Sequence, residues 1–315
     1  MQTFQWKGVF PALLTPFKKN DTIDFKLFEK NLQAQAGAGV DGIIIGGSLG
    51  EASTLTNNEK KELLVHAKAF LPESFPIVIN IAEQSTKEAI LLAQQAEATG
   101  ANGLMLLPPM RYAADEKETV QFFKSISFNT GLPIMLYNNP VDYKIPITIS
   151  MFAELASAKN ITAVKESSRD IINITRMINE FGDRFKILCG VDPLAFECLC
   201  AGADGWVAGL VDAFPKETVA IYRLIKAGKI QEALKIYRWF MPLLELDIHP
   251  KLVQYIKMAA AATGIGSEIV RAPRLMITGE ERQKVENIIQ RALKNRPTLP
   301  DYLHLEKAAE KVLQS

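Results

Sequence analysis

The sequence has few cysteines and few histidines for its length. Three of each occur in 315 residues, which argues against a disulfide framework and favours a reducing compartment. Cys198 and Cys200 lack a second pair of ligands, and the histidines stand in unrelated contexts at His66, His249 and His304. The sequence therefore predicts no metal site.

An excess of charge of one sign is also absent, and so are long apolar runs. The 36 basic and 35 acidic residues leave a formal net charge of +1, which is too small to attract nucleic acid or an anionic membrane. No apolar segment approaches the roughly 20 residues of a membrane span, and the start MQTFQWKGVF lacks the regions of a secretory signal. We expect a cytoplasmic protein that binds a small molecule, with neither nucleic acid nor a membrane as a partner.

What the sequence does contain is an alternation of apolar runs with amphipathic helical stretches. The runs are apolar throughout, so both faces of each predicted strand must be covered, as in parallel strands wrapped by helices. The predicted strands are 8–17, 40–47, 76–82, 102–108, 132–138, 161–165, 185–190 and 204–209. Eight such units predict an α/β fold, a (β/α)₈ TIM barrel over residues 1–228, with a doubly wound open sheet as the alternative.

After Pro215 the pattern changes to helices alone. The first of these helices can close the barrel. The remainder, residues 229–315, predicts a C-terminal helical extension packed on the barrel, because no Gly/Ser linker would let it move independently.

Polar residues stand where four of the predicted strands end. In a (β/α)₈ barrel the active site lies at that end of the strands. The segments are GGSLGE (46–51), PPMRY (108–112), YNNP (137–140) and the strand ITAVK, which stops at Lys165. These segments are the candidates for binding and catalysis.

Lys165 is the most informative of these residues. The fifth and sixth strands are neighbours if strand order follows the sequence, which brings the side chain of Tyr137 within reach of Lys165. The low-dielectric mouth of a barrel lowers the pKa of a lysine, and the neutral amine can attack a carbonyl carbon. We therefore predict Schiff-base chemistry. The alternative is a surface lysine paired with Glu166.

The loop GGSLGE predicts a carboxylate site. Its glycines and Ser48 can offer backbone N–H groups and a hydroxyl to an anion, and a simple strand-to-helix turn is the alternative. We expect Glu51 to hold this loop by hydrogen bonds. The segment GAGVDG (37–42) fits a dinucleotide-binding motif but precedes a strand, so we interpret it as a helix-to-strand turn.

The order of GGSLGE, YNNP and VKESS, inside a barrel with a helical extension, resembles the dihydrodipicolinate synthase and N-acetylneuraminate lyase superfamily over residues 7–300. The resemblance implies that Lys165 forms a Schiff base with a 2-oxo acid and that Tyr137 relays protons. It implies further site positions at Gly47, Ser48, Leu49, Gly190 and Val207. Neither a metal nor an organic cofactor is required, and a homotetramer built as a dimer of dimers is expected.

Three positions depart from the dihydrodipicolinate synthases. Leu49 replaces one of two hydroxyl residues, Asp142 replaces an arginine that binds the carboxylate of aspartate semialdehyde, and Arg111 lies near the place of a tyrosine given by a neighbouring subunit. With VRAPRL (270–275), the pattern is similar to the branch that acts in hydroxyproline breakdown. That branch deaminates and dehydrates 1-pyrroline-4-hydroxy-2-carboxylate to 2-oxoglutarate semialdehyde.

This hypothesis assigns a role to each candidate residue. We expect Lys165, Tyr137 and Ser48 to be catalytic, and the substrate to contact Asn139, Arg111 and Asp142 together with the lining positions named above. One alternative is another Schiff-base lyase of the superfamily, such as dihydrodipicolinate synthase, N-acetylneuraminate lyase, or a sugar-acid aldolase or dehydratase. A second is a non-catalytic barrel that binds a small oxo acid.

Overall fold

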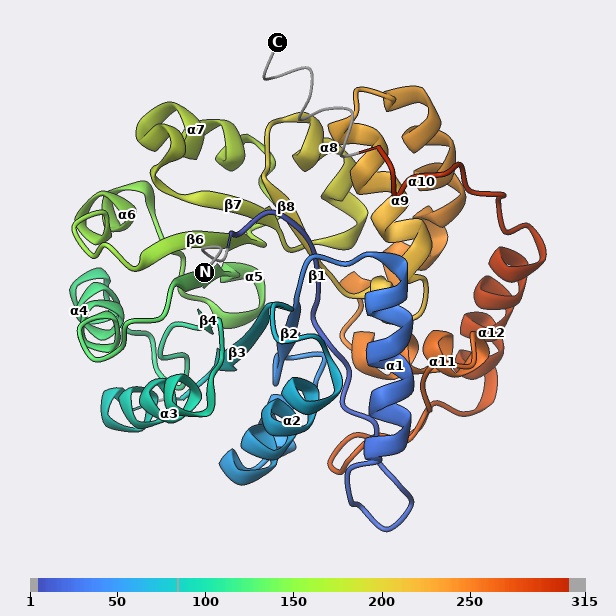
Figure 1. Ribbon diagram of the computed structural model, residues 1–315, viewed down its shortest axis with the longest axis horizontal. Coiled ribbons are helices and arrows are strands. Elements are labelled where there is room, and N and C mark those ends of the chain that lie inside the picture. Colours follow the sequence, from blue (N-terminus) through green and yellow to red (C-terminus); the bar gives the residue numbers. More distant parts are fainter. Residues whose placement is uncertain (1–4, 84, 306–315) are drawn as a thin grey trace.

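Eight parallel strands form a barrel at the centre of the molecule (Figure 1). The structure is a computed structural model of the chain, and it describes residues 5–83 and 85–305. The strands are β1 (Gly8–Pro11), β2 (Ile43–Ile45), β3 (Ile77–Ile81), β4 (Gly103–Leu106), β5 (Ile134–Asn138), β6 (Ile161–Glu166), β7 (Lys186–Cys189) and β8 (Gly205–Ala208). Between β1 and β2 the ring is joined by a bridge from Ala12 to Ile44 and by the Leu13 N–H, which donates to the Ile44 carbonyl at 2.9 Å. The predicted TIM barrel is confirmed, and the open sheet is excluded.

The strands are shorter than the apolar runs that predicted them. β1 ends at Pro11, although its run continues to Phe17, and β2 covers three of the residues predicted in 40–47. Leu13 and Phe17 are buried all the same, at 1% exposure each. The apolar pattern there reports burial beyond the end of the strand, because this segment packs into the same core as the strands.

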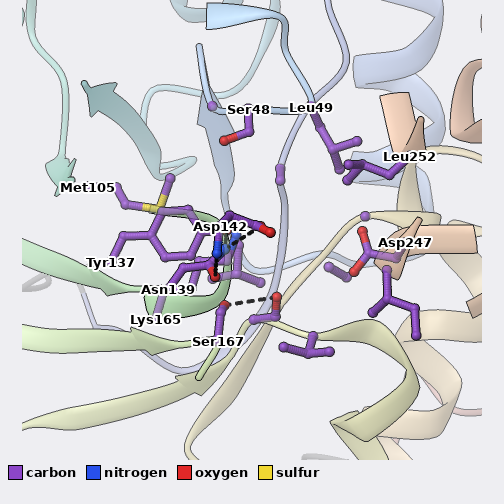
Figure 2. A pocket seen from close by; sticks show the side chains of 18 of the residues that line it. Ser48, Leu49, Met105, Tyr137, Asn139, Asp142, Lys165, Ser167, Asp247 and Leu252 are labelled. Atoms are coloured by element: carbon purple, nitrogen blue, oxygen red, sulfur yellow. Dashed lines mark hydrogen bonds between the residues drawn. The ribbon is translucent and has the colours of Figure 1, made fainter. Parts of the chain in front are cut away.

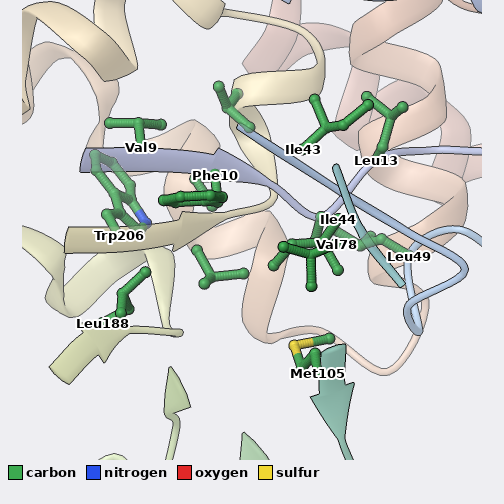
Figure 3. Packing of buried hydrophobic residues seen from close by; sticks show 14 of the residues in the cluster. Val9, Phe10, Leu13, Ile43, Ile44, Leu49, Val78, Met105, Leu188 and Trp206 are labelled. Carbon is green, nitrogen blue, oxygen red and sulfur yellow. The ribbon is translucent and has the colours of Figure 1, made fainter. Parts of the chain in front are cut away.

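Both faces of the barrel wall are buried, as the continuous apolar runs predict. All strand residues except Thr162 and Lys186 are buried. Side chains from several strands interlock in the core (Figure 3), where Phe10 of β1 and Trp206 of β8 are among the largest fully buried residues. This core fixes the wall from which the polar residues at the strand ends project.

Helices surround the barrel on its outer face (Figure 1). They are α1 (Phe25–Ala38), α2 (Asn57–Phe70), α3 (Thr86–Thr99), α4 (Glu116–Ser127), α6 (Ile149–Leu155), α7 (Ile172–Phe181), α8 (Ala195–Cys200) and α9 (Pro215–Lys226). The one-turn helix α5 (Pro140–Tyr143) follows β5 and lies inside this ring. Gly39 ends α1 in the left-handed region, with φ of 84°. The predicted helix-to-strand turn in GAGVDG is therefore confirmed, since glycine adopts this conformation without the cost of a Cβ.

The C-terminal part contains α10 (Ile230–Leu244), η5 (Glu245–Ile248), α11 (Leu252–Ala262) and α12 (Gly279–Lys294). Figure 1 shows these helices together on one flank, where α10 packs on α9 and α12. The predicted boundary at residue 228 falls between α9 and α10 and stays a prediction, and residues 306–315 of the predicted extension lie outside the described residues. No helix within the described ranges is long and apolar enough to cross a membrane.

Candidate active site

A cavity opens at the C-terminal ends of the strands, and it contains nearly all of the predicted site residues. It measures about 70 Å³, which suits a small acid better than a drug-sized ligand. Figure 2 shows Tyr137, Asn139, Lys165 and Ser167 on one side and Asp247 on the other. The predicted residues that line it are Gly47, Ser48, Leu49, Tyr137, Asn139, Asp142, Lys165, Gly190 and Val207.

Lys165 lies inside this cavity and is only 6% exposed. Parallel pairing of β5 and β6 sets Tyr137 opposite Lys165, and the lysine Nζ lies 4.0 Å from the centroid of the tyrosine ring. Side chains alternate along a strand, so Glu166 points away. Its carboxylate accepts hydrogen bonds from Asn138, Asn173 and the N–H of Ser168. The alternative of a surface Lys165–Glu166 pair is wrong.

The surroundings of Lys165 favour its neutral form. Burial lowers the pKa of the lysine, and the nearby Asp247, Tyr143 and Asp192 oppose this shift. Desolvation is the largest of these effects, since a buried ammonium loses the water that stabilises its charge. The neutral amine, which is the nucleophilic form, is therefore more populated here than in an exposed lysine.

Tyr137 is held in place by Asn139. The Asn139 Nδ2 donates to the Tyr137 hydroxyl at 3.2 Å and to Asp142 Oδ2 at 2.8 Å, and the Asp142 N–H donates back to Asn139 Oδ1 at 3.2 Å. Burial raises the pKa of Tyr137 far above its usual range. The phenol is thus protonated at neutral pH and can donate a proton first and accept one afterwards.

Tyr143 is a site residue that sequence reasoning missed. Its hydroxyl lies 2.5 Å from Ser48 Oγ, and its ring packs edge-on against Tyr137 with centroids 5.6 Å apart. Burial raises the pKa of Tyr143 as well. The sequence signal that could have identified Tyr143 was its position six residues after Tyr137, in the segment that follows the fifth predicted strand.

The buried carboxyl of Asp192 and the half-buried carboxyl of Asp247 complete the site, and sequence reasoning missed both. Asp192 follows β7 and accepts hydrogen bonds from Trp206 Nε1 at 2.9 Å and from the N–H groups of Gly209 and Leu210. Asp247 comes from η5 and lines the cavity. A search of all strand ends for acids would have found Asp192. The helical pattern around Asp247 gave no signal.

The loop after β2 has the features of an anion site. Gly46 and Glu51 bound it in the left-handed region, with φ of 71° and 58°. Within the described part of the chain, the N–H groups of Ser48 and Leu49 have no hydrogen-bond acceptor. Unpaired amides beside a cavity stabilise a negative charge. A substrate carboxylate can therefore be placed here.

A model of the Dihydrodipicolinate synthetase family matches residues 5–292. The chain belongs to this family. A 4-hydroxy-tetrahydrodipicolinate synthase of Exiguobacterium sibiricum is 31% identical over 273 residues, which are 86% of this chain and 91% of that protein. The solved structure of a 4-hydroxy-tetrahydrodipicolinate synthase from Methylacidiphilum fumariolicum SolV is similar with a TM-score of 0.87 and 28% identity, covering 92% of this chain and 97% of that one.

A third relative is solved with a small oxo acid. It is a chloride-inhibited dihydrodipicolinate synthase from Acinetobacter baumannii complexed with pyruvate, with a TM-score of 0.86 and 25% identity, covering 91% of this chain and 99% of that one. Membership of the Dihydrodipicolinate synthetase family makes this protein a class I lyase, an enzyme class that works through a lysine Schiff base. The hypothesis of a non-catalytic barrel is set aside.

Arg111 is the predicted site residue that does not line the cavity around Lys165. It is exposed on the segment after β4 and lines a second cavity of about 690 Å³, together with Lys60 and Arg274. Ser48 and Tyr143 line both cavities. The hydroxyl pair therefore lies between the Lys165 cavity and the larger one, and a contact of Arg111 with substrate stays a prediction.

Glu51 holds the anion loop through the C-terminal helices. Its buried carboxylate is paired with the buried Nζ of Lys257 on α11, and it accepts the N–H of Arg271 at 3.1 Å. Lys257 also donates to the Ile269 carbonyl at 2.7 Å. The structural role expected for Glu51 is confirmed. Within the described ranges, no group of His, Cys, Asp or Glu side chains could hold a metal ion.

We expect Lys257→Met to reduce the free energy of unfolding by about 3 kcal/mol, because it leaves the Glu51 charge buried without its closest cation. Urea denaturation measures the loss. The double variant with Glu51→Gln should recover part of it, and Lys229→Met, which removes an exposed pair with Glu232, should cost less than about 0.5 kcal/mol. Equal losses for the single and double variants would contradict this account.

Proposed function

We propose that this enzyme converts 1-pyrroline-4-hydroxy-2-carboxylate to 2-oxoglutarate semialdehyde and ammonia. The observation that carries the proposal is the kind of side chain on the cavity wall beyond the anion loop, where carboxyl groups stand and a second substrate carboxylate would need a cation. Two carboxyl groups, Asp142 and Asp247, line this wall. A synthase must hold the carboxylates of pyruvate and of aspartate semialdehyde together, whereas the pyrroline substrate has one carboxylate, which the anion loop can bind.

The first half of the reaction uses Lys165 and Tyr137. The neutral amine of Lys165 adds to C2, and the Tyr137 phenol gives its proton to the ring nitrogen. The C2 to ring nitrogen bond then breaks, which opens the ring and leaves an iminium between Lys165 and C2. The iminium acidifies the C3 proton, and the Tyr137 phenolate takes it.

The second half removes oxygen and nitrogen from the substrate. The electrons of the C3–H bond form an enamine, which expels the 4-hydroxyl group as water. A proton shift then places an imine at C5, and its hydrolysis gives the aldehyde and ammonia. Hydrolysis of the C2 imine frees Lys165. One water is lost and two are taken up, which balances the conversion.

Two observations favour dihydrodipicolinate synthesis as the second candidate. The relatives named above carry the name 4-hydroxy-tetrahydrodipicolinate synthase or dihydrodipicolinate synthase. Among the described residues that line the cavity, Arg169 is a second cation besides Lys165, exposed at the mouth. An arginine there can meet the carboxylate of aspartate semialdehyde from outside.

A direct comparison of substrates tests the two candidates. We expect release of semialdehyde and ammonia from the pyrroline substrate with a kcat/KM at least about 10²-fold above that for condensation of pyruvate with aspartate semialdehyde. The same preparation is used for both assays, and Lys165→Ala gives the background of each. Faster condensation would overturn the proposal in favour of the synthase.

The state of assembly and the compartment remain proposals. We propose a homotetramer built as a dimer of dimers, on the resemblance of this chain to its family. Sedimentation equilibrium of the full chain tests it, and a monomer at micromolar concentration would exclude it. A cytoplasmic location stays a prediction.

Tyr137→Phe should lower kcat by roughly 10² to 10³, which is the scale of one positioned proton-transfer group. The ring that packs against Lys165 is kept and only the hydroxyl is lost. Steady-state assays with the pyrroline substrate measure the effect. Tyr237→Phe is the matched control, because it removes the hydroxyl of another buried tyrosine, which donates to the Pro193 carbonyl at 2.7 Å and does not line the cavity. Equal kcat values for both variants would rule out the relay.

A further inference from the structure

We propose that Asp247 is a further catalytic residue, whose carboxyl group donates the proton with which the 4-hydroxyl group leaves as water. The inference rests on the proposed function, since it concerns the elimination step of that reaction. A hydroxide ion is a poor leaving group, so an acid placed at the leaving oxygen accelerates the step by about 10² to 10⁴. Lys165 cannot supply this proton because it is bound to C2, and Tyr137 lies beside Lys165, across the cavity from Asp247.

The fold gives the Asp247 side chain a defined place in the cavity. Its Oδ2 accepts the N–H of Asp192 at 3.2 Å. A Cβ at Gly209 would lie 2.5 Å from Asp247 Oδ1, so the absence of a side chain at position 209 leaves room for the carboxyl. Figure 2 shows Asp247 across the cavity from Tyr137 and Lys165. A substrate bound through C2 to Lys165 therefore has Asp247 on its opposite side.

Charged and titratable groups face Asp247 from several elements. They are Asp192 behind it, and Lys165, Tyr137 and Asp142 around the cavity. Burial raises the pKa of Asp247, and the charge of Asp192 raises it further, while Lys165 lowers it. Two carboxyls that share a low-dielectric site do not ionise together.

Hydrogen bonding decides which of the two carboxyls ionises first. Three N–H donors, from Trp206, Gly209 and Leu210, stabilise a negative charge on Asp192. Asp247 accepts one backbone N–H, from Asp192. Burial raises the pKa of both carboxyls, but these donors oppose the rise at Asp192, so Asp192 ionises before Asp247 and Asp247 is the acid of the pair. In the elimination the C4–O bond breaks, the Asp247 proton joins the leaving oxygen, and the resulting carboxylate regains a proton from solvent water.

The test combines Asp247→Asn with a change of leaving group. The amide keeps the size of the side chain and can still accept the Asp192 N–H, but it cannot donate an acidic proton. We expect Asp247→Asn to release semialdehyde from the 4-hydroxy substrate about 10² to 10³ times more slowly than the unmodified enzyme. With the 4-fluoro analogue the two enzymes should differ by less than about tenfold, because fluoride leaves without a proton.

Two further readouts separate an acid from a positioning group. Borohydride should still trap the Lys165 adduct in Asp247→Asn. The unmodified enzyme should lose turnover as pH rises through the pKa of Asp247, because the acid is then ionised, and Asp247→Asn should lack this decline. Gly209→Ala, which pushes Asp247 Oδ1 aside, should also be slow with the hydroxy substrate and recover with the fluoro analogue.

The outcomes distinguish this inference from the proposed function. Normal turnover by Asp247→Asn, or an equal loss with both leaving groups, would overturn the role of Asp247 while leaving the proposed reaction in place. Failure of the unmodified enzyme to release semialdehyde, with condensation of pyruvate intact, would overturn the proposed function and the role of Asp247 with it.

Discussion

Lys165→Ala should abolish turnover of every substrate and leave the fold intact. The variant lacks the amine that bonds to C2, and no other group in the mechanism can replace a covalent nucleophile. Burial of Lys165 costs desolvation energy, so removal of its amine is not expected to unfold the barrel. Circular dichroism and thermal unfolding check the fold, and semialdehyde release checks the activity.

The control for Lys165→Ala is a lysine on the adjacent strand at the opposite end of the barrel. Lys186 begins β7 and pairs with Asp183 and Asp204. Lys186→Ala should keep full turnover and should form a borohydride-trapped adduct with pyruvate, whose mass maps to the Lys165 peptide. Lys165→Ala should form none. A Lys165→Ala enzyme that still turns over would end the Schiff-base mechanism.

The lowered pKa of Lys165 also sets the response of the unmodified enzyme to acid. Addition to C2 needs the neutral amine, so kcat/KM should fall as pH falls through the pKa of Lys165 in the free enzyme. Because burial lowers this pKa, activity should persist to a lower pH than an exposed lysine would allow. A decline centred near the ordinary pKa of lysine would contradict the buried environment.

Gly190→Ala should lower kcat/KM by about 10² or more, although the change adds only one methyl group. A Cβ at position 190 would lie 2.1 Å from Ser167 Oγ and 2.6 Å from both Cγ and Cε of Lys165. The lysine stem must then leave its place beside Tyr137, and a displacement of about 1 Å at a reacting group costs about 10²-fold. The variant tests whether the position of the amine, and not only its presence, is required.

Gly37→Ala is the matched control for Gly190→Ala. Gly37 lies inside α1, and apart from its chain neighbours and the backbone of this helix, no described atom would lie within 4 Å of a Cβ there. Alanine should stabilise this helix by about 0.5 to 1 kcal/mol and leave turnover unchanged. Gly190→Ala should still unfold cooperatively but give a slower rate of borohydride trapping. Trapping and turnover at the unmodified level would show that the cavity can absorb the methyl group.

Local sequence patterns were sufficient to predict the barrel and to predict that Lys165 and Tyr137 lie together in its site. Strands buried on both faces must be apolar throughout, so their number and order could be predicted. The bounds could not, because Leu13 and Phe17 are buried without belonging to a strand. Lys165 and Tyr137 could be paired in advance, since adjacent parallel strands bring their C-terminal ends to the same edge.

Only the tertiary structure decided which distant residues meet this pair. Asp247 reaches the cavity because the packing of α10 and α11 carries η5 over the mouth of the barrel, and Tyr143 meets Ser48 because α5 folds back toward the loop after β2. Arg111, by contrast, lies in the neighbouring cavity. The sequence determined the elements and the nucleophile, since these follow from periodicity and strand ends. The positions of Asp247 and of the Ser48–Tyr143 hydroxyl pair depend on contacts between segments far apart in the chain, which no local sequence pattern indicates.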